Sequence, residues 1–249
     1  MNLLVDIGNS RIKWAVHDAG GLDSPRAAHY TDSDLPYVFD QEWNDLAAPE
    51  RVLVSNVAGA EAAGRLSRWT ADHWRIAPEF AAVTGEACGV KNTYEDVNQL
   101  GIDRWLAVIA AWNRYRRAAC LVDCGSAITI DGLDNNGAYL GGMILPGMEM
   151  MRLSLYSRAR GIRRRQQGAA AAPGFAQNTD QGIANGCLMA IVTLIDRVAR
   201  DMENKYSGEV ACLITGGDAE KIRAHLSLAF NHEPNLVLEG LQLCLGGGA

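Results

Sequence analysis

The sequence predicts an α/β fold made of two similar halves. Two apolar strands, Leu3–Ile7 and Cys120–Asp123, each lead into an Asp-x-Gly turn, which is followed by a strand of alternating apolar and polar residues. The turn aspartates, Asp6 and Asp123, lie 117 residues apart, close to half of the 249-residue chain. Asp-x-Gly alone is short enough to recur by chance. The shared strand context therefore carries the inference of a duplicated unit, with halves at residues 1–116 and 117–249.

The remaining elements follow from hydrophobic periodicity and turn residues. In the first half we expect strands at Leu3–Ile7, Ile12–His17 and Arg51–Ser55, and helices at Ala60–His73 and from Asp103 through Asn113. In the second half we expect strands at Cys120–Asp123, Ala127–Asp131, Ala138–Leu145 and Val210–Ile214, and helices from Pro146, from Thr179 to about Lys205, and at Ala219–Leu226. Pro146 suits a first helical turn, and Thr179 suits an N-cap.

Composition is that of an ordinary globular protein, with 48% hydrophobic and 21% charged residues. The net charge of −6 gives no general affinity for nucleic acids or acidic membranes, so no partner of either kind is expected. An anionic ligand must therefore be held locally. The arginines within residues 158–165 read as a solvated surface, and a role in attracting an anionic substrate stays open.

Cysteine and histidine usage indicates a reducing compartment and no zinc site. The six cysteines form no CxxC pair and mostly lie in apolar runs, which predicts buried, reduced thiols. The five histidines are scattered. Met1–Val5 is too short for a signal-peptide core, and the apolar run Cys187–Ile195 is too short to span a bilayer. We therefore expect a cytoplasmic protein.

The first turn carries the residues of a phosphate site. Gly8 allows a tight turn that presents N–H groups, and Asn9 and Ser10 add short donors. Asp6 could hold a hydrated Mg²⁺, and Lys13 could neutralise a terminal phosphate. A plain β-hairpin turn uses the same residue types, so the turn alone does not decide between the two.

Two further turns strengthen the phosphate interpretation. Asp123-Cys-Gly-Ser126 repeats the first turn, and Thr215-Gly-Gly-Asp218 lies between an apolar strand and a helix, where bare backbone can approach an anion. Neither GxxxxGK[ST] nor GxGxxG occurs in the sequence, so a P-loop or Rossmann site is not supported. Three such turns together are more specific than any one of them.

Asp103 differs in kind from the turn aspartates because it stands at the predicted start of a helix, after Gly101 and before Arg104. An Asp N-cap accounts for it structurally. A carboxylate that accepts a hydrogen bond from a substrate hydroxyl accounts for it functionally, and both can hold. A helix N-terminus favours the ionised carboxylate, which suits phosphoryl transfer because the loose transition state needs orientation more than early deprotonation. Trp105 and Trp112, seven residues apart, are expected to pack in the core.

Six motifs together, from about Leu3 to Gly240, resemble the type III pantothenate kinases. They are Asp6-x-Gly-Asn-Ser, Leu100-Gly-x-Asp-Arg-Trp105, Asp123-x-Gly-Ser-Ala-x-Thr129, Gly141-Gly-x-Ile-x-Pro-Gly147, Asn178-Thr179 and Thr215-Gly-Gly-Asp218. The resemblance implies a duplicated actin-like, ribonuclease H-like kinase fold, shared with acetate and sugar kinases, Hsp70 and actin, with a cleft between the halves. It also implies transfer of the γ-phosphoryl of ATP to pantothenate, the first step of coenzyme A biosynthesis.

The resemblance also implies roles for individual residues. Asp103 is similar to the family's proton acceptor, and Asp123 to a site for the monovalent cation, potassium or ammonium, that members need. The ATP and Mg²⁺ elements correspond to Asp6, Ile7, Gly8, Asn9, Ser10, Arg11, Ile12, Lys13 and Ser126. The pantothenate site corresponds to Tyr94, Gly101, Ile102, Asp103, Arg104 and Thr179. Ser126 stands where Thr is usual and keeps the hydroxyl. Family members act as homodimers, with the substrate pocket near the interface.

Two alternatives remain open from the residues. One is a kinase of the same fold that acts on another small alcohol, because a fold does not fix a substrate. The other is an accessory or regulatory protein on a retired kinase scaffold. Retention of Asp6, Asp103, Arg104 and Asp123 together argues against the second, because a retired site has no reason to keep four ionisable residues.

Overall fold

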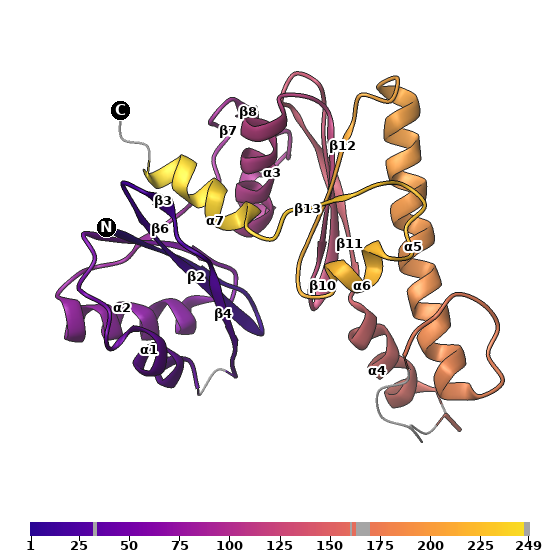
Figure 1. Ribbon diagram of the computed structural model, residues 1–249, viewed down its shortest axis with the longest axis horizontal. Coiled ribbons are helices and arrows are strands. Elements are labelled where there is room, and N and C mark those ends of the chain that lie inside the picture. Colours follow the sequence, from indigo (N-terminus) through magenta and orange to yellow (C-terminus); the bar gives the residue numbers. More distant parts are fainter. Residues whose placement is uncertain (32–33, 160, 163–169, 247–249) are drawn as a thin grey trace. The chain divides into compact units, whose positions relative to one another are not determined.

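The computed structural model describes residues 1–31, 34–159, 161–162 and 170–246. The chain forms two compact units, which are considered separately (Figure 1). Unit 1 is Met1–Arg114 together with the segment from Asn235 on, and unit 2 is Tyr115–Pro234. The division of the sequence into halves at residues 116 and 117 stays a prediction, and the structure adds that the last segment packs with unit 1.

Unit 1 is built on a mixed sheet in the order β3-β2-β1-β5-β6, with β4 also paired to β2. Its strands are β1 (Asn2–Ile7), β2 (Arg11–Asp18), β3 (Gly21–Leu22), β4 (Arg26–His29), β5 (Arg51–Asn56) and β6 (Glu79–Phe80). β1 runs antiparallel to β2 and parallel to β5. A separate hairpin joins β7 (Glu86–Ala87) to β8 (Val90–Lys91). The predicted strands β1, β2 and β5 are confirmed, whereas the two-residue strands carry no periodic signal and were not predicted.

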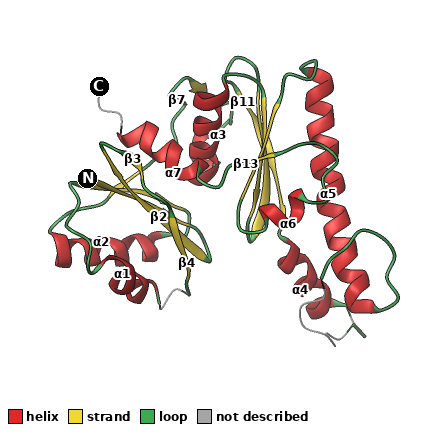
Figure 2. Ribbon diagram, viewed as in Figure 1, coloured by secondary structure: helices red, strands yellow, loops and turns green. Residues whose placement is uncertain are grey.

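Helices cover both faces of this sheet. The helices of unit 1 are α1 (Leu35–Trp43), α2 (Ala60–Trp74), α3 (Ile102–Tyr115) and α7 (Leu236–Leu241), with a 3₁₀ turn, η1 (Val97–Gln99), and a final π-type turn, η2 (Gln242–Gly246). α1 and α2 lie on one face (Figure 2), where Phe39, Trp43 and Trp69 pack on the strands. α7 contacts β1 and β5 on the other face. Trp105 and Trp112 of α3 are buried, as predicted.

Unit 2 repeats this arrangement. Its sheet has the order β11-β10-β9-β12-β13, formed by β9 (Ala119–Cys124), β10 (Ala127–Leu133), β11 (Tyr139–Pro146), β12 (Ala211–Thr215) and β13 (Asn231–His232). β9 is antiparallel to β10 and parallel to β12, just as β1 is antiparallel to β2 and parallel to β5. The same strand order and directions in both units are what a duplicated unit requires.

The helices of unit 2 are α4 (Met148–Arg158), α5 (Thr179–Lys205) and α6 (Ala219–Arg223). Leu188, Ile191 and Ile195 of α5 pack on alternate side chains of β9, in one core. By length and hydropathy α5 could cross a membrane, but a core helix passes the same test, and 44% of its most apolar window is buried. The apolar run Cys187–Ile195 lies inside this 27-residue helix, whose predicted range of Thr179 to about Lys205 is confirmed.

Three sequence-based boundaries are wrong. Pro146 ends β11 and does not start α4, whose N-cap is Gly147. Asn178, not Thr179, caps α5, because its side chain accepts a hydrogen bond from the backbone N–H of Gln181. α6 ends at Arg223 rather than Leu226. Helix ends are set by one or two local hydrogen bonds, which periodicity does not resolve.

Candidate functional site

Asp6 lies at the end of β1 on the face opposite α1 and α2. Val5 and Ile7, on either side of it, point into the core beneath those helices, and side chains alternate along a strand. In the sheet Asp6 is level with Lys13 of β2 and Ser55 of β5. The fully buried Ser55 donates its hydroxyl hydrogen to Asp6 Oδ1 at 2.8 Å. A carboxylate fixed beside a lysine offers a cation site and a phosphate partner at one place.

The turn after β1 is tied down by backbone contacts. The Gly8 N–H donates to the Arg11 carbonyl at 3.0 Å, and the Tyr30 hydroxyl donates to the Gly8 carbonyl at 2.5 Å. A Cβ on Gly8 would lie only 3.2 Å from the Arg11 oxygen, so glycine suits the tight turn. Asn9 and Ser10 are exposed at its tip. The turn therefore presents short polar groups on a fixed backbone.

Two members of the predicted ATP-binding run cannot use their side chains for binding. Ile7 and Ile12 are fully buried and pair with each other across β1 and β2. They form the base of the turn, so only their backbone can serve a ligand. Arg11 is exposed and Lys13 is half-buried, and both remain accessible from the turn.

The start of α3 brings most of the predicted pantothenate residues together. Asp103 lies in the first turn of the helix, and its Oδ1 accepts a hydrogen bond from the backbone N–H of Arg104 at 2.8 Å. A Cβ on Gly101 would lie 2.6 Å from the same oxygen. Glycine at position 101 thus keeps space for the carboxylate. Asp103 is a first-turn residue rather than the predicted cap.

Arg104, the residue after Asp103, contacts Tyr94 through its side chain. Arg104 is 7% exposed, and its Nη1 donates to the Tyr94 hydroxyl at 3.4 Å. Ile102 is buried in the same turn. Before it, Asp96 caps η1, and the backbone N–H of Asn98 holds the pKa of the Asp96 carboxyl below its usual value. The segment from residue 94 to residue 104 is therefore held by its own hydrogen bonds.

Asp123 occupies in unit 2 the place that Asp6 occupies in unit 1. It is half-buried and level with Thr129 of β10 and Thr215 of β12. Gly216, in a left-handed conformation with φ of 97°, approaches so closely that a Cβ there would lie 2.5 Å from Asp123 Oδ1. The two aspartates thus differ in their neighbours, a lysine and a serine for Asp6 and two threonines for Asp123.

The second turn is closed by backbone contacts with the start of α4. The Gly147 N–H donates to the Ser126 carbonyl at 2.9 Å, and a Cβ on Gly147 would lie 2.5 Å from that oxygen. Ser126 itself is exposed. Burial, then the charges of Asp123 and Asp218, raise the pKa of the Cys124 thiol. Cys124 is therefore a neutral core residue and not a nucleophile.

Thr179 is exposed at the first position of α5, in unit 2. The next residue, Asp180, is 5% exposed and accepts a hydrogen bond from the Tyr156 hydroxyl at 2.8 Å. Burial, and then this hydrogen bond, raise the pKa of Tyr156. Sequence reasoning missed this pair as it missed Ser55 and Tyr30, because each partner is distant in the chain.

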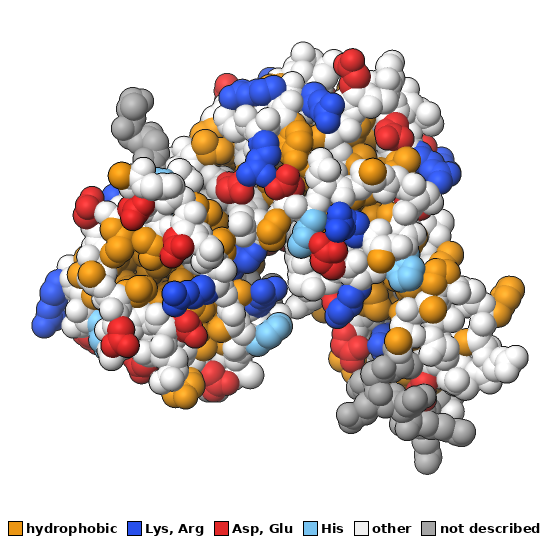
Figure 3. Space-filling model, in the orientation of Figure 1, with side chains coloured by type: hydrophobic (Ala, Val, Ile, Leu, Met, Phe, Trp, Pro, Cys, Tyr) orange, Lys and Arg blue, Asp and Glu red, His pale blue; other side chains and the backbone are white. Residues whose placement is uncertain are grey.

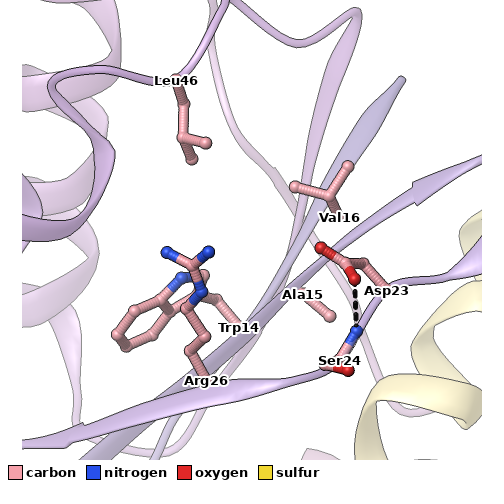
Figure 4. A pocket seen from close by; sticks show the side chains of 7 residues that line it. All are labelled: Trp14, Ala15, Val16, Asp23, Ser24, Arg26 and Leu46. Carbon is pink, nitrogen blue, oxygen red and sulfur yellow. Dashed lines mark hydrogen bonds between the residues drawn. The ribbon is translucent and has the colours of Figure 1, made fainter.

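A cavity in unit 1 does not serve as the ligand site. Its volume is about 40 Å³, enough for water but far too small for a nucleotide. Figure 4 shows its walls, formed by Trp14, Ala15, Val16, Asp23, Ser24, Arg26 and Leu46. None of these is a predicted site residue.

Two other predictions concern charge and the arginine-rich segment. On the face in Figure 3, cationic and anionic side chains are interspersed rather than gathered into one basic patch. Among the described residues, no group of three or more His, Cys, Asp or Glu side chains could hold a metal ion. Arg158 is exposed at the end of α4, whereas Arg160 and residues 163–165 lie outside the described residues.

Comparison with known proteins identifies the family. Residues 2–201 match the type III pantothenate kinase family. The chain belongs to the type III pantothenate kinases. A type III pantothenate kinase from Nitrosococcus oceani is 41% identical over 246 residues, which cover 97% of this chain and 92% of the relative. The activity of this kinase is the ATP-dependent phosphorylation of pantothenate, in coenzyme A biosynthesis.

Solved structures confirm the predicted actin-like fold of the kinase. A Baf family transcriptional activator from Campylobacter jejuni superposes with a TM-score of 0.58 at 23% identity, over 96% of this chain and 95% of that one. MreB 5 of Spiroplasma citri, bound to AMPPNP, gives a TM-score of 0.50 at 10% identity, over 97% and 94%. At these identities the likeness concerns the fold alone.

Proposed function

We propose that Asp103 is the residue of this pantothenate kinase that orients the substrate hydroxyl for attack on the γ-phosphoryl of ATP. The geometry at the start of α3 supports this role. The backbone N–H of Arg104 donates a hydrogen bond that fixes the Asp103 carboxylate, and Gly101, without a Cβ, leaves space for that carboxylate. A carboxylate held in one rotamer can accept the hydroxyl hydrogen and aim the oxygen. The loose transition state of phosphoryl transfer rewards such orientation more than a strong base.

Tyr94, Gly101, Ile102 and Arg104 would form the wall of the pantothenate site in unit 1. The guanidinium of the buried Arg104 donates a hydrogen bond to Tyr94, which supports a positive charge fixed in this segment. Pantothenate is a carboxylate anion, so a fixed guanidinium favours its binding. Thr179, exposed at the N-terminus of α5, would add a hydroxyl to the same substrate.

The turn from Asp6 to Lys13 would bind the ATP phosphates, and Ser126 would be a further ATP contact. Asp6 fits Mg²⁺, since this ion is held in proteins by one or two carboxylates plus water and phosphate oxygens. The hydrogen bond from Ser55 fixes the orientation of this carboxylate. When bound, Mg²⁺ would neutralise charge on the phosphates, as Lys13 does from β2.

Asp123 would hold the monovalent cation. Its register partners in the sheet are both threonines, so oxygen-bearing side chains flank it on two strands, and Gly216 brings bare backbone close to its carboxylate. This donor chemistry suits potassium or ammonium. Bound there, the cation would screen negative charge near the phosphates.

The active form would be a homodimer joined through unit 2. Its edge strand β11 and the helices α4 and α5 expose large apolar side chains: Leu140, Met143, Ile144, Met150, Leu153, Leu155 and Met189. An apolar edge strand favours pairing with another chain, and a second copy covers it with the same surface.

Light scattering tests this interface. The variant Ile144→Glu, changed at a residue that is 66% exposed, should be a monomer. Tyr37 of unit 1 is 64% exposed, and Tyr37→Glu, as the matched control, should remain a dimer. An Ile144→Glu protein that remained a dimer would contradict the proposed interface.

We assign the protein to the cytoplasm, where ATP is available. The burial of α5 residues in the core of unit 2 supports a role for this helix in packing rather than in a membrane.

A coupled kinase assay tests the assignment of Asp103. Asp103→Asn should fold, bind ATP and lose about 10²- to 10⁴-fold in kcat, the usual range for a positioned proton acceptor. Asp96→Asn is the matched control, because Asp96 is also a carboxylate that accepts a backbone N–H in this segment. Retention of most of the rate by Asp103→Asn would refute the assignment.

The same assay tests the cation site and the substrate. Asp123→Ala should flatten the activation by potassium or ammonium, and an unchanged salt response would remove Asp123 from that role. A panel of sugars and hydroxy acids should give far less turnover than pantothenate. Equal turnover of a sugar would favour a kinase for another alcohol.

A further inference from the structure

Two thiols in unit 1, outside the proposed site, lie in contact with each other. The Sγ atoms of Cys88 and Cys244 are 3.9 Å apart, although the residues are separated by 156 positions in the sequence. Both cysteines are half-buried, whereas Cys120, Cys124, Cys187 and Cys212 are buried. The prediction of uniformly buried thiols is therefore wrong for this pair.

Cys88 lies at the tip of the β7–β8 hairpin in a left-handed backbone conformation. Ala87 pairs with Val90, so Cys88 and Gly89 form a two-residue loop, with φ of 51° and 80°. Such a loop favours Asn, Asp or Gly at its first position, because other side chains are strained at positive φ. The tip is anchored to α3, since the side chain of Asn113 donates to the Cys88 carbonyl at 2.9 Å.

Cys244 is held in place separately, in the η2 turn. The Gln242 side chain, in the same turn, forms a hydrogen bond with His17 Nε2 of β2 at 2.8 Å. The Cys88 thiol donates a hydrogen bond to the Leu243 carbonyl, with 3.7 Å between sulfur and oxygen. The two sulfurs thus face each other from backbones that are fixed independently on unit 1.

We propose that Cys88 and Cys244 are a redox site, which hydrogen peroxide converts into a reversible intramolecular disulfide. The sulfurs need to approach by about 2 Å, which side-chain rotation and a small shift of the η2 turn supply. Peroxide oxidises the Cys88 thiol to a sulfenic acid and releases one water. Cys244 then attacks that sulfur, its proton leaves with the departing hydroxyl as a second water, and the disulfide forms.

The geometry of the pair carries this proposal. Burial, and then the neighbouring Cys88 thiol, raise the pKa of Cys244. We assign the first oxidation to Cys88, at the tip of the hairpin, and the resolving step to Cys244. The disulfide would tie the end of the chain to the hairpin that precedes Tyr94, and so hold α7 and η2 on unit 1.

Peptide mapping tests the proposal directly, since trypsin separates the two cysteines. Cys88 lies alone in the peptide of residues 76–91 and Cys244 alone in that of residues 224–249. The full-length protein is treated with hydrogen peroxide, blocked with an alkylating reagent, digested and analysed by mass spectrometry. The expected product is the cross-linked pair, about 2 Da lighter than the sum of its two thiol peptides and lost on treatment with dithiothreitol.

Two variants and the wild-type protein make the result decisive. Cys244→Ser should give no cross-link and leave a sulfenic acid on Cys88 that dimedone traps, while Cys187→Ala should still form the cross-link. Oxidised wild type should melt several degrees above the reduced protein, and Cys244→Ser should show no such shift. The proposal would be overturned if the Cys88 and Cys244 peptides stayed fully alkylated, and therefore unoxidised, at peroxide doses that oxidise another cysteine. A cross-link found only in covalent dimers would overturn it as well.

Discussion

Replacing Gly240 by alanine should loosen the contact between α7 and α3. A Cβ at position 240 would lie 2.0 Å from the Leu106 carbonyl oxygen, whereas real Cβ contacts stay above 3.0 Å. The two helices must therefore separate by about 1 Å. The atoms that the Cβ would meet all belong to the Leu106 backbone, which cannot rotate away as a side chain can. Overpacking of this kind costs about 1–3 kcal/mol even though alanine favours a helix.

Gly64→Ala is the matched control. Gly64 is an exposed residue of α2, and a Cβ there would meet nothing within 4 Å. The same substitution should stabilise the protein by about 0.5–1 kcal/mol, because alanine loses less backbone entropy on folding. If Gly240→Ala lowers the free energy of unfolding and Gly64→Ala raises it, the difference is due to the contact with Leu106.

Urea unfolding followed by tryptophan fluorescence measures both variants, with equal m-values required for a comparison of stabilities. The melting temperature of Gly240→Ala should fall by about 2–4 °C per kcal/mol lost in a chain of this size. Because Leu106 is one turn beyond Asp103, the rate should be measured as well. A Gly240→Ala protein as stable as Gly64→Ala would refute the close approach of α7 to α3.

Three other changes test the site and its supports. Gly101→Ala should raise KM for pantothenate and lower kcat while leaving KM for ATP unchanged, because its Cβ would displace the Asp103 carboxylate 2.6 Å away. Ser55→Ala, which removes the buried hydroxyl bound to Asp6, should cost about 1 kcal/mol in urea unfolding and weaken Mg²⁺ activation. The Asp96 carboxylate accepts a hydrogen bond from the backbone N–H of Asn98, which lowers the pKa of Asp96. This hydrogen bond therefore stabilises the fold above about pH 4, and the stabilisation is lost as the pH falls through the lowered pKa. The unfolding free energy of Asp96→Ala should accordingly depend less steeply on pH in acid.

Local sequence was enough for most of the central fold. The strands around Asp6 and Asp123 were predicted because a short apolar run followed by a glycine turn forms a local signal. α2, α3 and α5 were predicted because their buried positions recur at helical spacing. The nine-residue α1 and the two-residue strands were missed, since they are too short to show a period.

The candidate site divides in the same way. Local sequence predicts which side chains stand at strand ends and helix starts, among them Asp6, Asp103 and Asp123, because turn and cap chemistry acts within a few residues. Their partners follow from the tertiary fold: Ser55 for Asp6, Gly216 for Asp123, and Cys244 for Cys88. These contacts join residues far apart in the chain. They depend on sheet register and helix packing, which the whole core fixes at once and no local pattern encodes.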